Sequence, residues 1–357
     1  MSDDIDLGVL AESFAEMLGA EWPRERAVAW SRAPALMADT LWEQMAALGW
    51  TALTIPEAHG GLGLGTEAAA ALHSALGAAA APVPMLGTTL AAALVAAAGS
   101  AAQQAALLPR FADGSLRAAV AQPGDAIVAT DGRTASGTVT DMVDAPSATI
   151  LFLRGERAGR ACWLAIPGDA AGVTIARDAL TDATRTLGTV TLDGVALGDD
   201  AVILAGDPGA LDDLLLRTAA VAIAADAIGG GEVALAGTID YMKIREQFGV
   251  VIGSFQALKH RIADHQAALV AARGLVEHAA GLAADDPNAL LNALSAKQHV
   301  TRIVAEIARD CIQLHGGVGF TAEYFPHIYL KRAKLNEALF GTRVVLLDRI
   351  ADMLEAA

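Results

Sequence analysis

The spacing of apolar positions along the chain changes twice. From residue 5 to about 117, apolar residues recur at helical spacing, as Leu41, Met45 and Leu48 do, and residues 67–80 are almost all helix formers. From about 118 to 207, short β-branched runs alternate with turn dipeptides, which predicts antiparallel strands. These runs are residues 126–129, 147–153, 162–166 and 187–192.

Long helical periods return after about residue 208, at 210–247, 254–283, 286–314 and 324–353. The order of helices, strands and helices predicts an α+β multidomain chain. We expect three domains: an all-α domain over 1–117, a β domain over 118–207 and a helical bundle over 208–357.

Composition narrows the class of protein. The chain has 357 residues, of which 54% are hydrophobic and only 4% aromatic, so small and branched aliphatic side chains must fill the core. A net charge of −16 argues against a nucleic-acid partner, because phosphate binding requires clustered Lys and Arg. Cys162 and Cys311 have neither disulfide-like nor metal-like spacing, which is typical of a reducing compartment.

Nothing in the sequence predicts a membrane span or a signal peptide. The first residues, Met1 to Asp4, are acidic, whereas a signal peptide begins with a basic region. Apolar stretches such as 77–83 and 219–228 are short or interrupted, so we expect a cytoplasmic protein. The high apolar content is compatible with buried subunit interfaces or with a large Ala-rich core.

Two features that could suggest ligand sites have plainer explanations. The glycine-rich loop 60–65 lacks the preceding strand and following helix of a dinucleotide fingerprint, so we interpret it as a structural turn. His260 and His265 are five residues apart rather than the four that place two imidazoles on one helical face. We therefore expect no metal site.

Near the C-terminus, the helical pattern is interrupted at Gln313-Leu314-His315-Gly316-Gly317-Val318-Gly319-Phe320. A helix-ending turn needs one glycine, whereas three in four positions let a backbone approach a ligand and offer its N–H groups to phosphate. Two further motifs accompany this one. They are Arg245-Glu246-Gln247-Phe248-Gly249 with Gln256 downstream, and Leu339-Phe340-Gly341-Thr342.

Together these motifs resemble the C-terminal half of the FAD-dependent acyl-CoA dehydrogenases. The resemblance extends over nearly the whole chain, because residues 41–50, Ile55-Pro56-Glu57 and the glycine loop look like that family's N-terminal domain. It implies an N-terminal helical domain, a middle antiparallel β-barrel-like domain and a C-terminal four-helix bundle.

The resemblance also implies a cofactor, a substrate and partners. The cofactor is FAD, the substrate an acyl-CoA thioester that is dehydrogenated at its α and β carbons, and the electron acceptor an electron-transfer flavoprotein. FAD would lie at a subunit interface of a dimer or tetramer, homomeric or heteromeric, in lipid catabolism. The residues matching the family's cofactor contacts are Arg245, Phe248, Gln256, Gln313, Gly316, Gly317 and Thr342.

The chain departs from the family at the catalytic base. The family's glutamate, which removes the α-proton, corresponds to Phe340, and the alternative position that some members use corresponds to Ala219. Neither side chain can accept a proton. The nearest acids are Glu337, Asp226 and Glu232, for which we expect surface or helix-pairing roles, with Glu337 a weak candidate for a substitute base.

The residues that face the flavin ring are altered as well. The family's Trp-x-Thr corresponds to Asp141, Met142 and Val143, and its Thr-Glu-Pro corresponds to Ala121-Gln122-Pro123. The half of the motif set that holds the ring is therefore eroded, while the half that reaches a neighbour's FAD tail is intact.

This division favours a base-less subunit that shares FAD with a sister chain supplying the base. Three alternatives stay open at this point. They are a homomer with weak or vestigial FAD binding, a non-catalytic structural or regulatory homologue, and a same-fold flavin enzyme with another reaction, such as an oxygenase or a nitroalkane oxidase.

Overall fold

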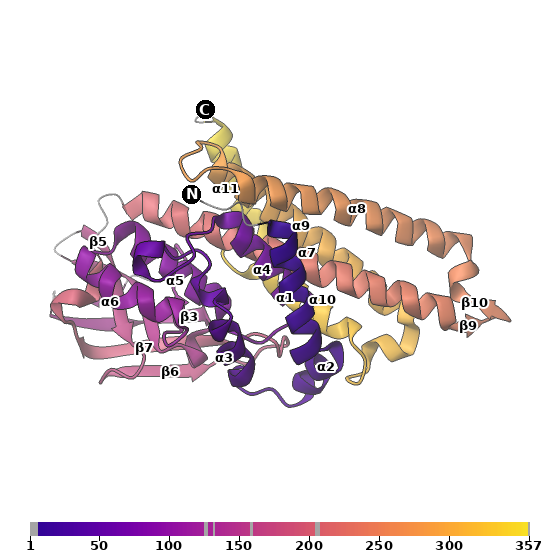
Figure 1. Ribbon diagram of the computed structural model, residues 1–357, viewed down its shortest axis with the longest axis horizontal. Coiled ribbons are helices and arrows are strands. Elements are labelled where there is room, and N and C mark those ends of the chain that lie inside the picture. The colour runs from indigo at the N-terminus through magenta and orange to yellow at the C-terminus, as the bar shows by residue number, and fades with distance from the viewer. Residues whose placement is uncertain (1–5, 125–127, 131–132, 158–159, 204–207, 356–357) are drawn as a thin grey trace.

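The computed structural model describes residues 6–124, 128–130, 133–157, 160–203 and 208–355. Met1 to Asp4 and residues 126–127 of the first expected strand lie outside this set. The sheet occupies one end of an elongated molecule, and the long C-terminal helices extend to the other (Figure 1).

The N-terminal region is helical, as predicted. Asp6 caps the first helix by accepting hydrogen bonds from the backbone of Gly8 and Val9, and Ser100 with Gln103 forms a capping box at the start of the last. The helices are α1 (Leu7–Glu21), α2 (Arg24–Arg32), α3 (Asp39–Ala47), α4 (Thr66–Ala78), α5 (Met85–Ala98) and α6 (Ala101–Ala112), with the short η1 (Trp50–Ala52) and η2 (Glu57–His59).

The glycine-rich loop folds back on η1 and η2 as a turn, in agreement with its structural interpretation. The N–H of Gly61 donates to Pro56 O, and the N–H of Gly63 donates to Ile55 O. A Cβ at Gly61 would lie 1.9 Å from Ile55 O, so only glycine fits there.

Within the described residues, one sheet of eight strands forms in the order β6-β7-β3-β2-β4-β5-β8, with β1 beside β4. The strands are β1 (Ala118–Val120), β2 (Val128–Thr130), β3 (Thr134–Val143), β4 (Ile150–Arg157), β5 (Arg160–Pro167), β6 (Val173–Arg177), β7 (Leu187–Ala196) and β8 (Val202–Ile203), with η3 (Ala145–Ser147) and η4 (Asp199–Ala201) between strands.

The prediction of antiparallel strands is confirmed for most of the sheet and wrong at one place. The pairs β2–β3, β3–β7, β4–β5, β5–β8 and β6–β7 are antiparallel, but β1 and β2 both pair with β4 in parallel. The chain leaves β2 through the long β3 strand and returns as β4 in its original direction. Among the described residues, β6 and β8 stand at the two edges of the sheet.

In the described part of the chain after the sheet, the α-helices are α7 (Pro208–Ile244), α8 (Gln256–Gly281), α9 (Ala289–His315), α10 (Pro326–Ala338) and α11 (Arg343–Glu355). A hairpin of β9 (Glu246–Gln247) and β10 (Val250–Val251), then η5 (Ile252–Ser254), joins α7 to α8, and η6 (Gly316–Phe320) follows α9. The helical period expected over 324–353 is broken between α10 and α11, where Phe340 and Gly341 both have positive φ.

Helix α7 is the central helix of the fold. It is long and apolar enough to cross a membrane by length and composition, yet 83% of its most apolar window is buried inside the protein. It packs closely on α4: a Cβ at Gly77 would lie 1.9 Å from Asp226 O, and one at Gly229 would lie 1.9 Å from Ser74 O. Glycine at these two crossings therefore permits the contact.

Two apolar cores cross the expected domain boundaries. One joins α5, α6 and the sheet to the first half of α7 and to Phe340, and the other joins α1–α4 to α7–α11. Strand β1 begins at Ala118 and α7 at Pro208, the two positions at which the sequence changes character. A division into three independent domains stays a prediction.

Candidate functional site

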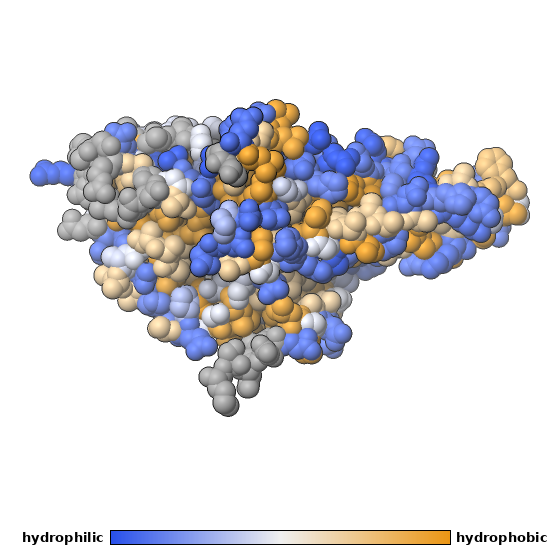
Figure 2. Space-filling view, turned by 90° about the horizontal axis from the view of Figure 1, so that it is seen from above, coloured by the Kyte–Doolittle hydropathy of each residue, from blue (hydrophilic) through white to orange (hydrophobic). Residues whose placement is uncertain are grey.

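Three of the residues expected to contact FAD lie between the end of α7 and the start of α8. Beyond the helix, the β9–β10 hairpin turns at Phe248, whose φ is +57° and whose side chain is 93% exposed. Arg245 and Gln256 are also exposed on either side of the hairpin. Apolar side chains cover this tip of the molecule (Figure 2). Such a surface on a protruding hairpin is typical of a contact with another chain or a ligand.

The end of α9 carries the other cofactor residues. The helix ends at His315, and Gly316 has φ +65° in the turn that follows. Gln313, Gly316 and Gly317 are exposed, and a Cβ at either glycine would meet no atom within 4 Å. The packing of this chain therefore does not require the second glycine. An external group approaching the backbone would require it.

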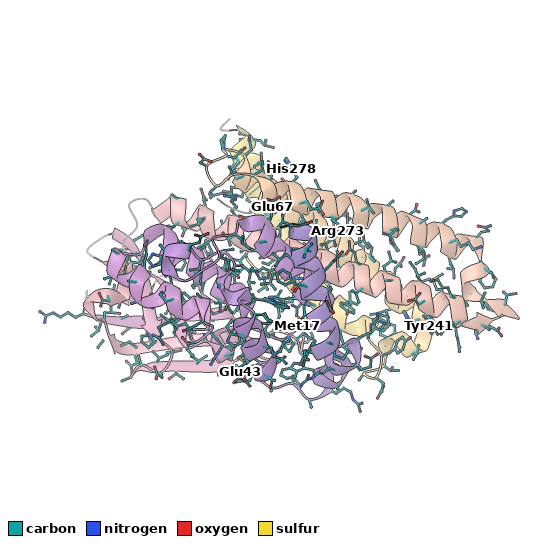
Figure 3. All side chains as sticks on the ribbon, viewed as in Figure 1. Met17, Glu43, Glu67, Tyr241, Arg273 and His278 are labelled. Atoms are coloured by element: carbon teal, nitrogen blue, oxygen red, sulfur yellow. The ribbon has the colours of Figure 1, made fainter. Side chains whose placement is uncertain are left out.

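The fold brings these two segments together. The ring of Tyr241, near the end of α7, stacks on His315 with centroids 4.4 Å apart, and its hydroxyl donates to His315 O at 3.3 Å. An apolar cluster of Met242, Ile252 and Leu314 lies beside this contact, and Figure 3 shows Tyr241 at this end of the bundle. Arg245, Phe248, Gln256, Gln313, Gly316 and Gly317 thus lie at one end of the molecule.

Thr342 does not join this group. It precedes α11, in the turn that also carries Phe340, and its carbonyl accepts the N–H of Leu346 at 3.0 Å. Figure 1 shows α11 well away from the β9–β10 hairpin.

The position of the family's base is closed and apolar in this chain. Phe340 is 2% exposed, has φ +52° and shares one core with Ala219, Met142 and Val143. Asp141, at the first flavin-facing position, instead points to solvent from a bulged part of β3 with φ +55°.

Two side chains from distant elements hold the turn between α10 and α11. The backbone N–H of Phe340 donates to Gln122 Oε1 at 2.5 Å, and the Lys297 ammonium donates to Gly341 O at 2.8 Å. Burial lowers the pKa of Lys297 to about 7, although nearby Glu337 acts to raise it. Gln122 follows β1 and Lys297 belongs to α9, so the turn is fixed from two sides.

Of the three acids weighed as substitute bases, two take part in ion pairs at or near the surface. Glu337 pairs with Lys334 on the same helix, and Glu232 of α7 makes a two-pronged pair with Arg273 of α8, whose Nε lies 2.7 Å from Glu232 Oε1. These contacts agree with the expected surface and helix-pairing roles.

Asp226 differs from the other two acids in being buried, with 1% of its surface exposed. Its carboxylate accepts hydrogen bonds from Arg332 at 2.6 Å and Asn336 at 2.8 Å, and pairs with Arg185 at 3.0 Å. Burial raises the pKa of Asp226, but Arg185 and Arg332 outweigh burial and bring the pKa below its ordinary value. Asp226 therefore joins α7, α10 and the segment before β7, which agrees with the helix-pairing role expected for it and not with a surface role.

Tyr241, His315 and Lys297 contribute to these sites although no motif in the sequence assigns them a role there. Tyr241 could have been noticed four residues before Arg245, and Lys297 as a lysine among the apolar positions of its helix. Their partners lie on other elements, which no local pattern reveals.

A fit to FAD can be judged on these residues. The tip of α7 and the end of α9 offer a guanidinium, two amides and an open glycine backbone, which suit an anionic diphosphate and its adenosine. The core around Phe340 is filled by buried apolar side chains, and the Gln122 amide oxygen beside it accepts the Phe340 N–H. This chain therefore fits the ADP half of FAD and does not fit the ring half.

No metal site competes with this interpretation among the described residues, since no three or more His, Cys, Asp or Glu side chains are placed to hold an ion. Cys162 and Cys311 are both buried.

Comparisons with known proteins give the family. The profile described as "Acyl-CoA dehydrogenase, N-terminal domain" matches residues 9–115, and "Acyl-CoA dehydrogenase, C-terminal domain" matches residues 211–355. The acyl-CoA dehydrogenase IpdE2 of Mycobacterium tuberculosis is 35% identical over 313 residues, which cover 87% of this chain and 86% of that protein. The acyl-CoA dehydrogenase FadE34 of the same organism is 31% identical over 87% of this chain, but over only 42% of its own length.

Solved structures agree. The ChsE4–ChsE5 complex from Mycobacterium tuberculosis has a TM-score of 0.90 at 26% identity, with 98% of this chain and 97% of that chain covered. The Tcur3481–Tcur3483 steroid acyl-CoA dehydrogenase has a TM-score of 0.88 at 29% identity, with 98% of both chains covered. The chain belongs to the acyl-CoA dehydrogenase family, whose members are FAD-dependent flavoprotein oxidoreductases of lipid catabolism.

Proposed function

We propose that this chain is the base-less subunit of a heteromeric acyl-CoA dehydrogenase that introduces an α,β double bond into an acyl-CoA thioester. A sister chain supplies the catalytic base and the pocket for the flavin ring. One observation carries the proposal: the residues suited to the ADP tail are exposed at one end of the molecule, whereas Phe340 is buried at the position of the base.

The chemistry requires the sister chain. Dehydrogenation moves the α-proton of the thioester to a base and the β-hydrogen, with its electron pair, to a flavin. Phe340 and Ala219 have no lone pair for the proton, and Glu232 and Asp226 are committed to arginines. In the proposal, the base therefore comes from the sister chain.

The part of this chain is to bind and orient. In the proposal, the Arg245 guanidinium neutralises the diphosphate of FAD held mainly by the sister chain, and the amides of Gln256 and Gln313 reach adenosine or phosphate oxygens. The glycine backbone at 316–317 allows close approach of the phosphates. The exposed Phe248 covers the tail and excludes water from it.

Relatives supply further support. Two of the structural relatives are named as pairs of different chains, ChsE4–ChsE5 and Tcur3481–Tcur3483. FadE34 extends well beyond the part that this chain matches, which leaves room for a second such unit. The word "steroid" in one name makes a steroid-derived acyl-CoA the first substrate to test. A subunit of a caffeyl-CoA reductase–Etf complex, 41% identical over 29% of this chain, supports an electron-transfer flavoprotein as acceptor.

The test is co-expression with the acyl-CoA dehydrogenase-like chain encoded nearest to it. We expect the two chains to co-purify with bound FAD and to bleach on anaerobic addition of acyl-CoA. Arg245→Ala should release most of the FAD, whereas Arg110→Ala, an exposed arginine on α6, should not.

If the two chains do not co-purify, or if Arg245→Ala leaves the FAD content unchanged, the hypothesis that they share one FAD site is wrong. A colourless complex without turnover would indicate the structural or regulatory homologue instead. Consumption of O₂ with reduced flavin would indicate an oxygenase.

A further inference from the structure

We infer that Tyr241 is a positioning residue that holds the two halves of the FAD-tail site, Arg245 just after α7 and the glycine segment after α9, in one fixed geometry. This inference rests on the proposed function, because it assigns a role towards the cofactor of that site. It concerns a residue that makes its contribution through others and not by touching the reacting atoms.

Tyr241 makes hydrogen bonds to both halves of the site. Its backbone carbonyl accepts the N–H of Arg245 at 2.9 Å, which extends the last turn of α7 to the arginine. Its side-chain hydroxyl donates to the carbonyl of His315 at 3.3 Å, at the last residue of α9. One residue thus connects the backbone of the arginine to the backbone that leads into Gly316.

The bond to His315 fixes the peptide plane that precedes the glycines. The carbonyl end of this plane is held by Tyr241, and its other end, the N–H of Gly316, donates to Gln313 O. Because a peptide unit is planar, fixing both ends sets its orientation. A Cβ at Gly316 or Gly317 would meet no atom within 4 Å, so side-chain packing does not direct these glycines, and in the proposal this plane sets where their backbone points.

The His315 ring strengthens the arrangement. It is 4% exposed, its Nδ1 lies 2.7 Å from Cys311 O, and a carbonyl only accepts, so Nδ1 carries the proton. The same ring stacks on Tyr241 at 4.4 Å and meets Tyr324 edge-on at 5.1 Å. Ring and carbonyl of His315 therefore both contact Tyr241.

The geometry also explains why Tyr241 acts on affinity rather than on chemistry. Its contacts lie at the end of the bundle, while the turn of Phe340 belongs to the core of the sheet. Loss of the hydroxyl should loosen the diphosphate site and leave the reacting carbon untouched. The expected signature is weaker FAD binding with a normal kcat once FAD is in excess.

The experiment compares three variants in the co-purified complex, stripped of flavin and titrated with FAD. Tyr241→Phe keeps the ring stack and the backbone hydrogen bond to Arg245. It removes the hydrogen bond from the hydroxyl to His315 O. Tyr329→Phe is the matched control, since its hydroxyl donates to Ala78 O at 2.7 Å elsewhere in the fold. Arg245→Ala reports on the site itself.

We expect Tyr241→Phe to weaken FAD binding about fivefold, as the loss of one hydrogen bond would, and excess FAD to restore kcat. Tyr329→Phe should lower Tm at least as much and leave FAD affinity unchanged. If Arg245→Ala weakens FAD binding and Tyr241→Phe does not, or if Tyr329→Phe weakens it equally, the positioning role is wrong. If Arg245→Ala has no effect, the proposed function fails, and the positioning role fails with it.

Discussion

The backbone N–H of Phe340 donates to the side chain of Gln122 at 2.5 Å, which ties the α10–α11 turn to the segment after the first strand. In the family this turn presents the catalytic glutamate, and here it directs a phenyl ring into the core of the sheet. The same hydrogen bond therefore helps to hold Phe340 in the core, at the position that the family uses for its catalytic base.

Restoring the carboxylate should not restore activity to this chain alone. Phe340→Glu would place an unpaired carboxylate among Met142, Val143 and Ala219, at a cost of several kcal/mol. We expect a lower Tm and no acyl-CoA-dependent bleaching. Turnover by the isolated Phe340→Glu chain would show that a working ring pocket is present after all.

Glu337 should be dispensable for chemistry. It pairs with Lys334 and is partly exposed, so Glu337→Gln should change the stability of the complex by less than about 1 kcal/mol. Initial rates with saturating acyl-CoA should match those of the unmodified complex. A drop of a hundredfold or more in kcat would instead identify Glu337 as a substitute for the glutamate that is missing at position 340.

Asp226 should be the most sensitive ionic position in the fold. Asp226→Asn leaves the buried guanidiniums of Arg185 and Arg332 without a carboxylate, which should cost about 3–5 kcal/mol of unfolding free energy. Asp213→Asn, at an exposed pair with Arg349, is the control and should cost less than about 1 kcal/mol. Urea titrations that rank the two variants equally would contradict the buried network.

Asp144 should make the folded chain more stable at acidic pH than at neutral pH. The buried carboxyl accepts the N–H of Gly87 at 3.2 Å, and burial raises its pKa to about 6, although Arg185 and Arg332 act to lower it. A folded pKa above the unfolded 3.8 means stability that is complete below pH 3.8 and lost as the pH rises through about 6.

Asp144→Asn removes the loss of stability that follows ionisation of the carboxyl. Asparagine tolerates the φ of +63° at this position. We expect the variant to be more stable than the original above pH 6, by up to about 3 kcal/mol, and the difference to vanish near pH 4. Thermal unfolding across this range measures it. A constant difference at all pH values would show that the carboxyl does not titrate in this window.

The sequence anticipated features that depend on local pattern and on motif. The onset of strands at 118, the return of helices at 208 and the two FAD-tail segments all follow from residues close together in the chain. That these segments meet required the Tyr241–His315 contact, which joins residues 74 positions apart.

Features that depend on contacts between residues far apart in the chain could not be predicted from local sequence pattern. Leu339 and Phe340 continue an apolar helical pattern, and the break there depends on Gln122 and Lys297. Asp226 looks like any acid in a helix until Arg332, 106 residues later, packs against it. The parallel pairing of β1 and β2 with β4 depends on how the sheet is threaded, which alternating polarity does not encode.

The most direct test of the account is the ratio of FAD to protein chains in the co-purified complex, from flavin absorbance and quantitative amino-acid analysis. The account predicts one FAD for each pair of unlike chains, because this chain fits the ADP tail but not the ring. One FAD per chain, or a stable homomer of this chain alone that retains FAD and bleaches with acyl-CoA, would contradict it.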